Sequence, residues 1–143
     1  MADPRAFVSF DYDHDEESRR LFVGQGKKKS PTPFVIGDWS SKDVLPQKTW
    51  EQTIETKIGR CNMVIVLVGR QTHSATGVKK EIAMADRKNV PVFGVYVDGA
   101  GTSTSLPTGL PRNRTIAWKW DVIAAAIRQM MGEGKNKPAG VRR

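Results

Sequence analysis

Hydrophobic runs alternate along the chain with segments of helical period. The run 63–69 is almost wholly aliphatic and the run 90–97 is rich in valine and otherwise apolar, which is typical of strands buried on both faces. Shorter β-rich runs at 6–10, 34–36 and 115–118 predict three more strands. Parallel strands need crossovers, so this alternation predicts an α/β fold. We expect a doubly wound, flavodoxin-like sheet of five parallel strands, order 2-1-3-4-5, in three α/β/α layers.

The helical segments are predicted from their apolar spacing and their end signals. An acidic stretch at 11–17 opens the first helix, which we expect to end at Gly24 and Gly26 before a loop over 27–33. Ser74 or Thr76 is the expected cap of the third helix. The second helix carries one apolar stripe, formed by Trp50, Ile54, Ile58 and Cys61. The last helix, 120–131, has Ile123, Ile127, Met130 and Met131 on one side.

Length and charge limit the classes of protein that fit. The 143 residues suit one domain, which we expect at 1–131, followed by a flexible basic tail at 132–143. The net charge of +8 comes largely from that tail and from Lys27, Lys28 and Lys29. A nucleic-acid-binding protein needs a basic stripe, preferably with stacking aromatic residues, so no nucleic acid partner is expected.

Compartment and metal content follow from what the composition lacks. No apolar run approaches the roughly 20 residues of a membrane span, and the first residues contain no apolar signal-peptide segment. We therefore expect a cytoplasmic protein that contacts no membrane. One cysteine and two histidines give no internal disulfide and no cysteine-built or histidine-rich metal centre, so no metal is expected.

The predicted topology locates a functional site before any motif is considered. In doubly wound sheets, ligands bind beyond the carboxyl ends of the strands, near the point where the strand order reverses. The loops at 11–15, 37–43 and 70–77 lie at that edge. A flavin or dinucleotide site would need a glycine-rich turn between a strand and a helix, and none occurs in that context. A phosphoacceptor site would need an aspartate at the end of the third strand, where the sequence has Gly69 and Arg70.

Two segments resemble a known family. The opening Phe7-Val8-Ser9-Phe10-Asp11-Tyr12-Asp13-His14-Asp15 is similar to the start of the TIR-like proteins of Thoeris antiphage systems. The stretch from Val66 to Ser74, followed by Val78-Lys79-Lys80-Glu81-Ile82, resembles their hydrophobic strand, Gly-x-x-Thr turn and W-V-x-x-E-[IL] helix. The resemblance covers roughly residues 5–130. Gly77 stands where the family has tryptophan, which is a departure at the signature itself.

The resemblance implies an enzyme that consumes NAD⁺, either a glycohydrolase or an ADP-ribosyl cyclase. Glu81 would be the catalytic residue. NAD⁺ would be the substrate, no cofactor would be needed, and the nucleotide product would activate an effector in defence. Self-association is expected for activity. The residues expected to bind the substrate are Phe10, Asp11, Tyr12, Asp38, Trp39 and Ser74.

Each assignment has an alternative. Glu81 follows two lysines and could be an ordinary exposed helix glutamate. In the catalytic assignment too, Glu81→Gln is expected to change stability by no more than about 0.5 kcal/mol, because Glu81 is taken to lie on the helix surface. Asp11 could serve only the dipole of the first helix. Trp39 could stack on a nucleotide base or contact a neighbouring subunit. The whole domain could be a non-catalytic scaffold for protein–protein association.

Overall fold

The computed structural model describes residues 3–31, 34–39 and 47–133 of the chain. Its sheet has five strands in the order β2-β1-β3-β4-β5. All four neighbouring pairs are parallel, including β3 with β4, so the predicted fold is confirmed. The strands are β1 (Arg5–Ser9), β2 (Val35–Trp39), β3 (Met63–Val68), β4 (Val92–Tyr96) and β5 (Thr115–Ile116). The helices are α1 (Glu16–Lys29), α2 (Gln47–Gly59), α3 (Thr76–Arg87) and α4 (Trp120–Glu133), with short 3₁₀ turns η1 (Thr72–Ser74) and η2 (Arg112–Arg114).

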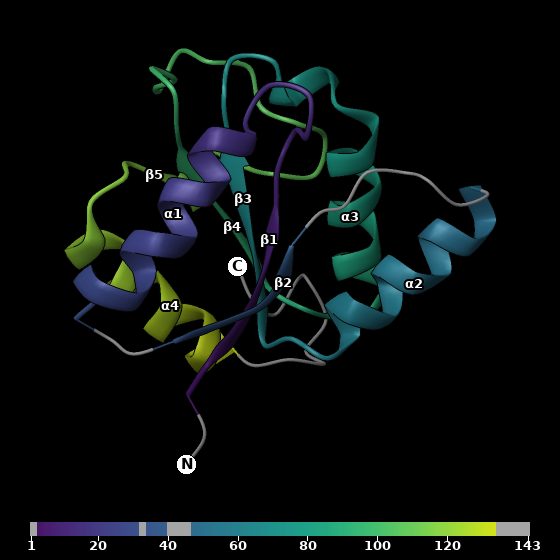
Figure 1. Cartoon of the computed structure of the whole chain (residues 1–143), viewed down its shortest axis with the longest axis horizontal. Helices are drawn as coiled ribbons and strands as arrows, with labels where there is room; N and C mark the ends of the chain where they lie inside the picture. Colours follow the sequence, from purple (N-terminus) through teal and green to yellow (C-terminus); the bar gives the residue numbers. More distant parts are fainter. Residues whose placement is uncertain (1–2, 32–33, 40–46, 134–143) are drawn as a thin grey trace.

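Helices cover both faces of the sheet. Figure 1 shows α1 and α4 on one side and α2 and α3 on the other. Alternate residues of β3 pack into the two helix–sheet layers, because successive side chains of a strand point to opposite faces. Val64, Val66 and Val68 pack with α2 and α3. Met63, Ile65 and Leu67 pack with α1 and α4. All six are fully buried, as the unbroken aliphatic run predicted.

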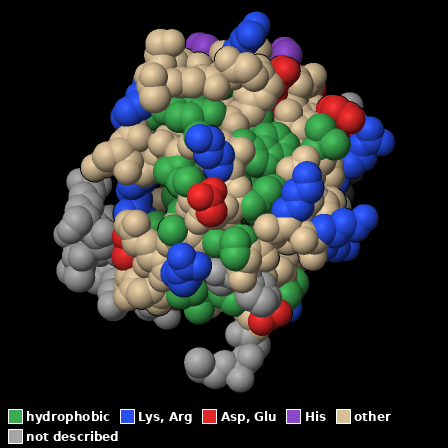
Figure 2. All heavy atoms as spheres, turned by 90° about the vertical axis from the view of Figure 1, so that its left-hand side faces the viewer, with side chains coloured by type: hydrophobic (Ala, Val, Ile, Leu, Met, Phe, Trp, Pro, Cys, Tyr) green, Lys and Arg blue, Asp and Glu red, His purple; other side chains and the backbone are tan. Residues whose placement is uncertain are grey.

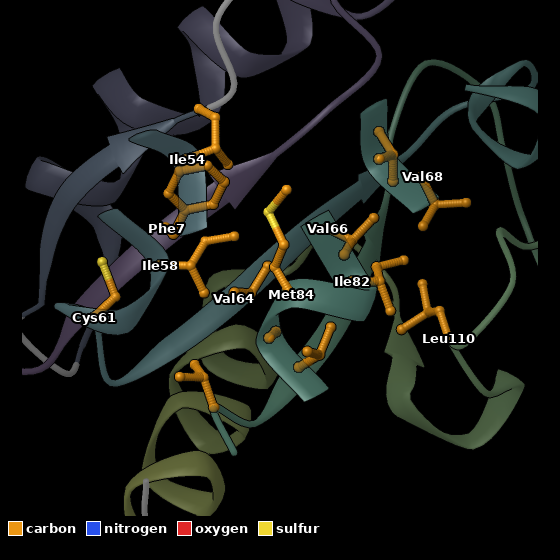
Figure 3. Close-up of a cluster of buried hydrophobic side chains, with 14 of the residues drawn as sticks. Phe7, Ile54, Ile58, Cys61, Val64, Val66, Val68, Ile82, Met84 and Leu110 are labelled. Carbon is orange, nitrogen blue, oxygen red and sulfur yellow. The ribbon is translucent and has the colours of Figure 1, made fainter. Parts of the chain in front are cut away.

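The layer between the sheet and helices α2 and α3 is built from the predicted apolar stripe. Trp50, Ile54, Ile58 and Cys61 are all at most 6% exposed. Figure 3 shows Ile54 and Ile58 beside Phe7 of β1, with Met84 and Ile82 of α3 in the same cluster. This layer fixes α3 against β1 and β3, and α3 carries Glu81.

The first helix does not end at its glycines, so that prediction was wrong. α1 runs through Gly24 and Gly26 to Lys29, well into the expected loop. A Cβ at Gly26 would lie 3.1 Å from the Phe34 ring and 3.4 Å from the Trp120 ring. Gly26 is therefore a point of close approach between α1, the segment before β2 and α4. Tertiary contact at this position outweighs the helix-breaking tendency of glycine, which is only about 1 kcal/mol.

Other element ends also differ from the predictions. β2 continues past Gly37 and Asp38 to Trp39, because its backbone pairs with β1 along that length. α4 continues to Glu133, where Arg114 forms an ion pair with the Glu133 carboxylate at 2.8 Å. The first two residues of the expected tail are thus helical, and 134–143 lie outside the described residues. Met131 is 41% exposed, unlike the rest of its predicted stripe.

The face formed by α1 and α4 mixes hydrophobic and basic side chains. Figure 2 shows its Lys and Arg side chains separated by hydrophobic and other groups. Leu21 of α1 and Val122 and Met131 of α4 are among its exposed hydrophobic residues. On this face, the described side chains form no continuous basic stripe of the kind that nucleic acid binding requires.

Candidate functional site at the carboxyl ends of β1 and β3

A buried hydrogen bond joins the end of β1 to α3. The hydroxyl of Ser9, the last residue of β1, donates to Oε1 of Glu81 at 2.6 Å. Ser9 is 0% exposed and Glu81 is 1% exposed. Ser9 pairs with Val66 of β3, so the contact lies near the carboxyl edge of the two central strands. The prediction that Glu81 lies near the β1 end therefore agrees with the observed geometry.

Helical periodicity explains why Glu81 points inward. Val78, Glu81, Ile82 and Ala85 occupy positions i, i+3, i+4 and i+7, which share one face of a helix, and all four are buried. The expectation of an exposed glutamate is wrong, and the small stability change predicted for Glu81→Gln loses the surface position on which it rested. A glutamate on a buried stripe is rare in a purely structural helix. It marks Glu81 as a functional candidate.

The residues after β1 pack against one another. Phe10 is buried in the core, with its ring centroid 5.2 Å from that of Tyr12. The guanidinium of Arg19 lies over the Phe10 ring at 5.7 Å from its centroid. Tyr12 is only partly buried. Phe10 and Tyr12 belong to the layer between the sheet and helices α1 and α4, whereas Ser9 bonds to Glu81 of α3, a helix that packs on the other face of the sheet.

Asp11 shapes the same loop. Its carboxylate accepts a hydrogen bond from the backbone N–H of Asp13 at 3.1 Å and contacts Nδ1 of His14 at 2.6 Å. The hydrogen bond that the His14 imidazole donates to the Asp11 carboxylate raises the pKa of His14 above its usual 6.5. Asp11 is 7% exposed. This contact is local, and it gives Asp11 a role within the loop itself.

A second buried connection, which the sequence did not reveal, links the same two regions. Thr72 donates its hydroxyl proton to Oδ2 of Asp15 at 3.0 Å and accepts the N–H of Gly69 at 2.8 Å. Asp15 is 2% exposed, and its burial raises the pKa of its carboxyl, while the Thr72 hydrogen bond opposes that shift. We call Asp15, Gly69 and Thr72 the loop clasp. The Gly-x-x-Thr spacing was visible in the sequence, but its aspartate partner was not.

The remaining expected site residues are Ser74, Asp38 and Trp39. Ser74 is exposed and donates its hydroxyl to the carbonyl of Gln71 at 2.9 Å. The N-cap of α3 is Ala75, with no side-chain cap, so the predicted capping by Ser74 or Thr76 was wrong. Asp38 and Trp39 pair through their backbones with Phe7 and Val8 of β1. They belong to a strand instead of the expected loop, and their side chains lie outside the described residues.

Metal and membrane features are absent from the described part of the chain. There, no group of three or more His, Cys, Asp or Glu side chains is arranged to hold a metal ion. Cys61 is a free, buried thiol. None of the helices described here combines the length and apolarity that a membrane span requires.

The comparisons with known proteins place this geometry in a family. Residues 7–102 match the family described as "Thoeris protein ThsB, TIR-like domain", a range that contains Ser9, the loop clasp and Glu81. The chain belongs to this TIR-like family. A solved structure titled "Crystal Structure of a prokaryotic SEFIR domain" has the same fold, with a TM-score of 0.52, 14% identity and coverage of 89% of each chain. No curated protein matches the sequence at a significant level.

The departure from the family signature at Gly77 has a structural counterpart. A Cβ at Gly77 would lie 3.9 Å and 4.0 Å from two ring carbons of Trp50 on α2. Trp50 is 6% exposed. An indole ring from the neighbouring helix thus packs beside the position where other TIR-like proteins carry their own tryptophan.

Proposed function

We propose that this TIR-like protein cleaves the bond between nicotinamide and ribose in NAD⁺ and releases an ADP-ribose-type signalling nucleotide. The observation that carries the proposal is the buried carboxylate of Glu81 on the apolar face of α3, held at the carboxyl end of β1. Membership of the Thoeris family supports a nucleotide that activates an effector in antiphage defence. The proposal requires NAD⁺ as substrate and no further cofactor.

The chemistry needs one well-placed carboxylate. The glycosidic C–N bond breaks with its electron pair going to nicotinamide, which leaves as a neutral molecule and needs no general acid. The ribose ring becomes oxocarbenium-like, as in glycoside hydrolysis, and the Glu81 carboxylate stabilises that positive charge. Water attack at the anomeric carbon, with loss of one proton to solvent, then completes hydrolysis. Attack by a nucleophile of the same ADP-ribose completes cyclisation.

The substrate-binding residues are proposed on the same basis. Phe10 and Tyr12 form an aromatic pair next to Ser9, and Asp11 follows directly. Asp38 and Trp39 lie on the neighbouring strand β2, beside residues 7 and 8 of β1. Ser74 precedes α3. These positions follow β1, lie beside it in the sheet or precede α3, and we propose that a nucleotide that reaches Glu81 lies among them.

Access to Glu81 requires movement. The side chain is 1% exposed, so a ribose can touch its carboxylate only after covering residues shift. We propose that self-association of the domain favours the open arrangement, since a contact made only by the open state shifts the population toward it. Turnover per protomer should therefore rise with protein concentration.

A non-catalytic scaffold is the second candidate. The burial of Glu81 favours it, because an enclosed and hydrogen-bonded carboxylate can also serve only to join β1 and α3. Such a protein would act through its surface. The two candidates differ in one measurable property, the release of nicotinamide.

The test compares wild-type protein with Glu81→Gln at several protein concentrations, with nicotinamide release and product mass as readouts. Glutamine keeps an acceptor for the Ser9 hydroxyl but removes the charge, so turnover should fall about 10²–10³-fold. Glu51→Gln is the matched control, since Glu51 is a partly exposed α2 residue that pairs with Lys80 at 3.5 Å. It should keep wild-type turnover. A wild-type protein that is inert toward NAD⁺ under all conditions would overturn the proposal and favour the scaffold instead.

A further inference from the structure

Ser9 is the one polar side chain in the buried part of β1. Ala6, Phe7 and Val8 of the same strand are fully buried and apolar, as is Phe10 directly after it. A buried hydroxyl needs a hydrogen-bond partner, since a buried donor left without one keeps the full cost of its lost hydration. The Ser9 hydroxyl donates its hydrogen bond to Glu81, a residue 72 positions later in the chain.

The partners differ greatly in conformational freedom. A glutamate side chain has three rotatable torsions, whereas the serine hydroxyl sits one bond from a Cβ fixed by the sheet. Ser9 is held by its register with Val66 in a parallel pair. A hydrogen bond to an ionised carboxylate is roughly twice as strong as one between neutral groups. The hydrogen bond from Ser9, which is fixed in a central strand, therefore restricts the position of the flexible Glu81 carboxylate.

We propose that Ser9 is a positioning residue for catalysis, which orients the Glu81 carboxylate at the carboxyl end of β1 without touching the substrate. This inference rests on the proposed NAD⁺-cleaving function. It assigns Oε1 to the Ser9 hydroxyl, so that the other carboxylate oxygen faces the reacting ribose when the site opens. The precision matters because an electrostatic stabiliser acts only when it is preorganised at the place where charge develops.

The loop clasp provides the matched control. Thr72 joins the same two regions through a buried hydroxyl, but its partner is Asp15 and not Glu81. Thr72→Val removes that hydroxyl with little change of shape, just as Ser9→Ala removes the other. A loss that comes merely from loosening the two regions would appear in both variants. A loss that comes from Glu81 would appear only in Ser9→Ala.

The experiment measures kcat and KM for NAD⁺ cleavage, together with unfolding midpoints. Ser9→Ala should lower kcat about tenfold, equivalent to about 1.4 kcal/mol, and should leave KM within about threefold. Thr72→Val should keep kcat within about threefold of wild type, even if its unfolding midpoint falls as much as that of Ser9→Ala. Ser9→Thr keeps the hydroxyl and should retain the kcat of the wild type. If the Ser9→Thr protein does not fold, Ser9→Cys replaces it; its thiol is a weaker donor, so its kcat should lie between those of wild type and Ser9→Ala.

A double-mutant cycle with Glu81→Gln completes the test. If Ser9 acts through Glu81, the Ser9→Ala change should have almost no further effect on turnover in the Glu81→Gln background. Additive losses would overturn the inference, and so would a Ser9→Ala protein as fast as or faster than wild type. In both cases wild-type activity shows that the proposed function stands. An inert wild-type protein would overturn both.

Discussion

Gly69 and Asp15 lie so close together that no side chain fits between them. A Cβ built on Gly69 at the end of β3 would be 2.4 Å from Oδ1 of Asp15, before the start of α1. The N–H of Gly69 donates to Thr72, whose hydroxyl donates to Asp15. The close approach and the two hydrogen bonds hold the segment after β1 against the segment after β3, beside the candidate site.

This contact predicts that Gly69→Ala is destabilising. The added methyl must push the buried Asp15 carboxylate aside, and overpacking of this kind costs about 1–3 kcal/mol. The free energy of unfolding, measured by urea denaturation, should fall by that amount. Gly24→Ala is the control: Gly24 is an exposed α1 residue with open space around its Cβ position, so alanine should stabilise by up to about 1 kcal/mol. Equal effects in both variants would contradict the contact.

The buried Asp15 carboxyl predicts a pH dependence of stability. Burial raises its pKa in the folded state above the ordinary 3.8, so the folded protein holds the proton more tightly than the unfolded chain does. Its contribution to stability is therefore fully present below 3.8 and is lost as pH rises through the raised pKa. Asp15→Asn does not titrate, so its unfolding midpoint relative to wild type should climb with pH across that interval and then level off. A difference that is constant or falls with pH would show that Asp15 is not protonated more readily in the folded state.

The contact between Asp11 and His14 predicts a measurable shift in one proton equilibrium. The hydrogen bond to the Asp11 carboxylate is the main cause of the raised pKa of His14, and the charge of Asp13 is a smaller one. Asp11→Asn should therefore bring the pKa of His14 back toward 6.5, while Asp13→Asn should lower it only slightly. Proton NMR of the imidazole resonances checks both variants. Equal shifts would mean that the 2.6 Å contact does not form in solution.

Some features of the site could have been predicted from sequence, and others could not. Val78, Ile82 and Ala85 define the buried face of α3, and position 81 falls on that face, so the burial of Glu81 was available from periodicity alone. The neighbouring Lys79 and Lys80 instead suggested that Glu81 is exposed to solvent. The Ser9–Glu81 bond was not available, because nothing local specifies which residue 72 positions away a buried hydroxyl will meet.

The sequence by itself determined the architecture of this TIR-like domain. Runs such as Met63–Val68 must be buried on both faces, and parallel strands with short segments between them leave few right-handed arrangements other than the observed order. Only the tertiary structure decided where α1 ends, since Gly26 is helical because Phe34 and Trp120 pack closely against it. It also decided the partners of Ser9 and Asp15. Periodic burial depends on neighbouring residues and can be recognised in a short stretch of sequence. Close approaches and buried hydrogen bonds depend on distances between segments far apart in the chain, and these distances are set only by folding.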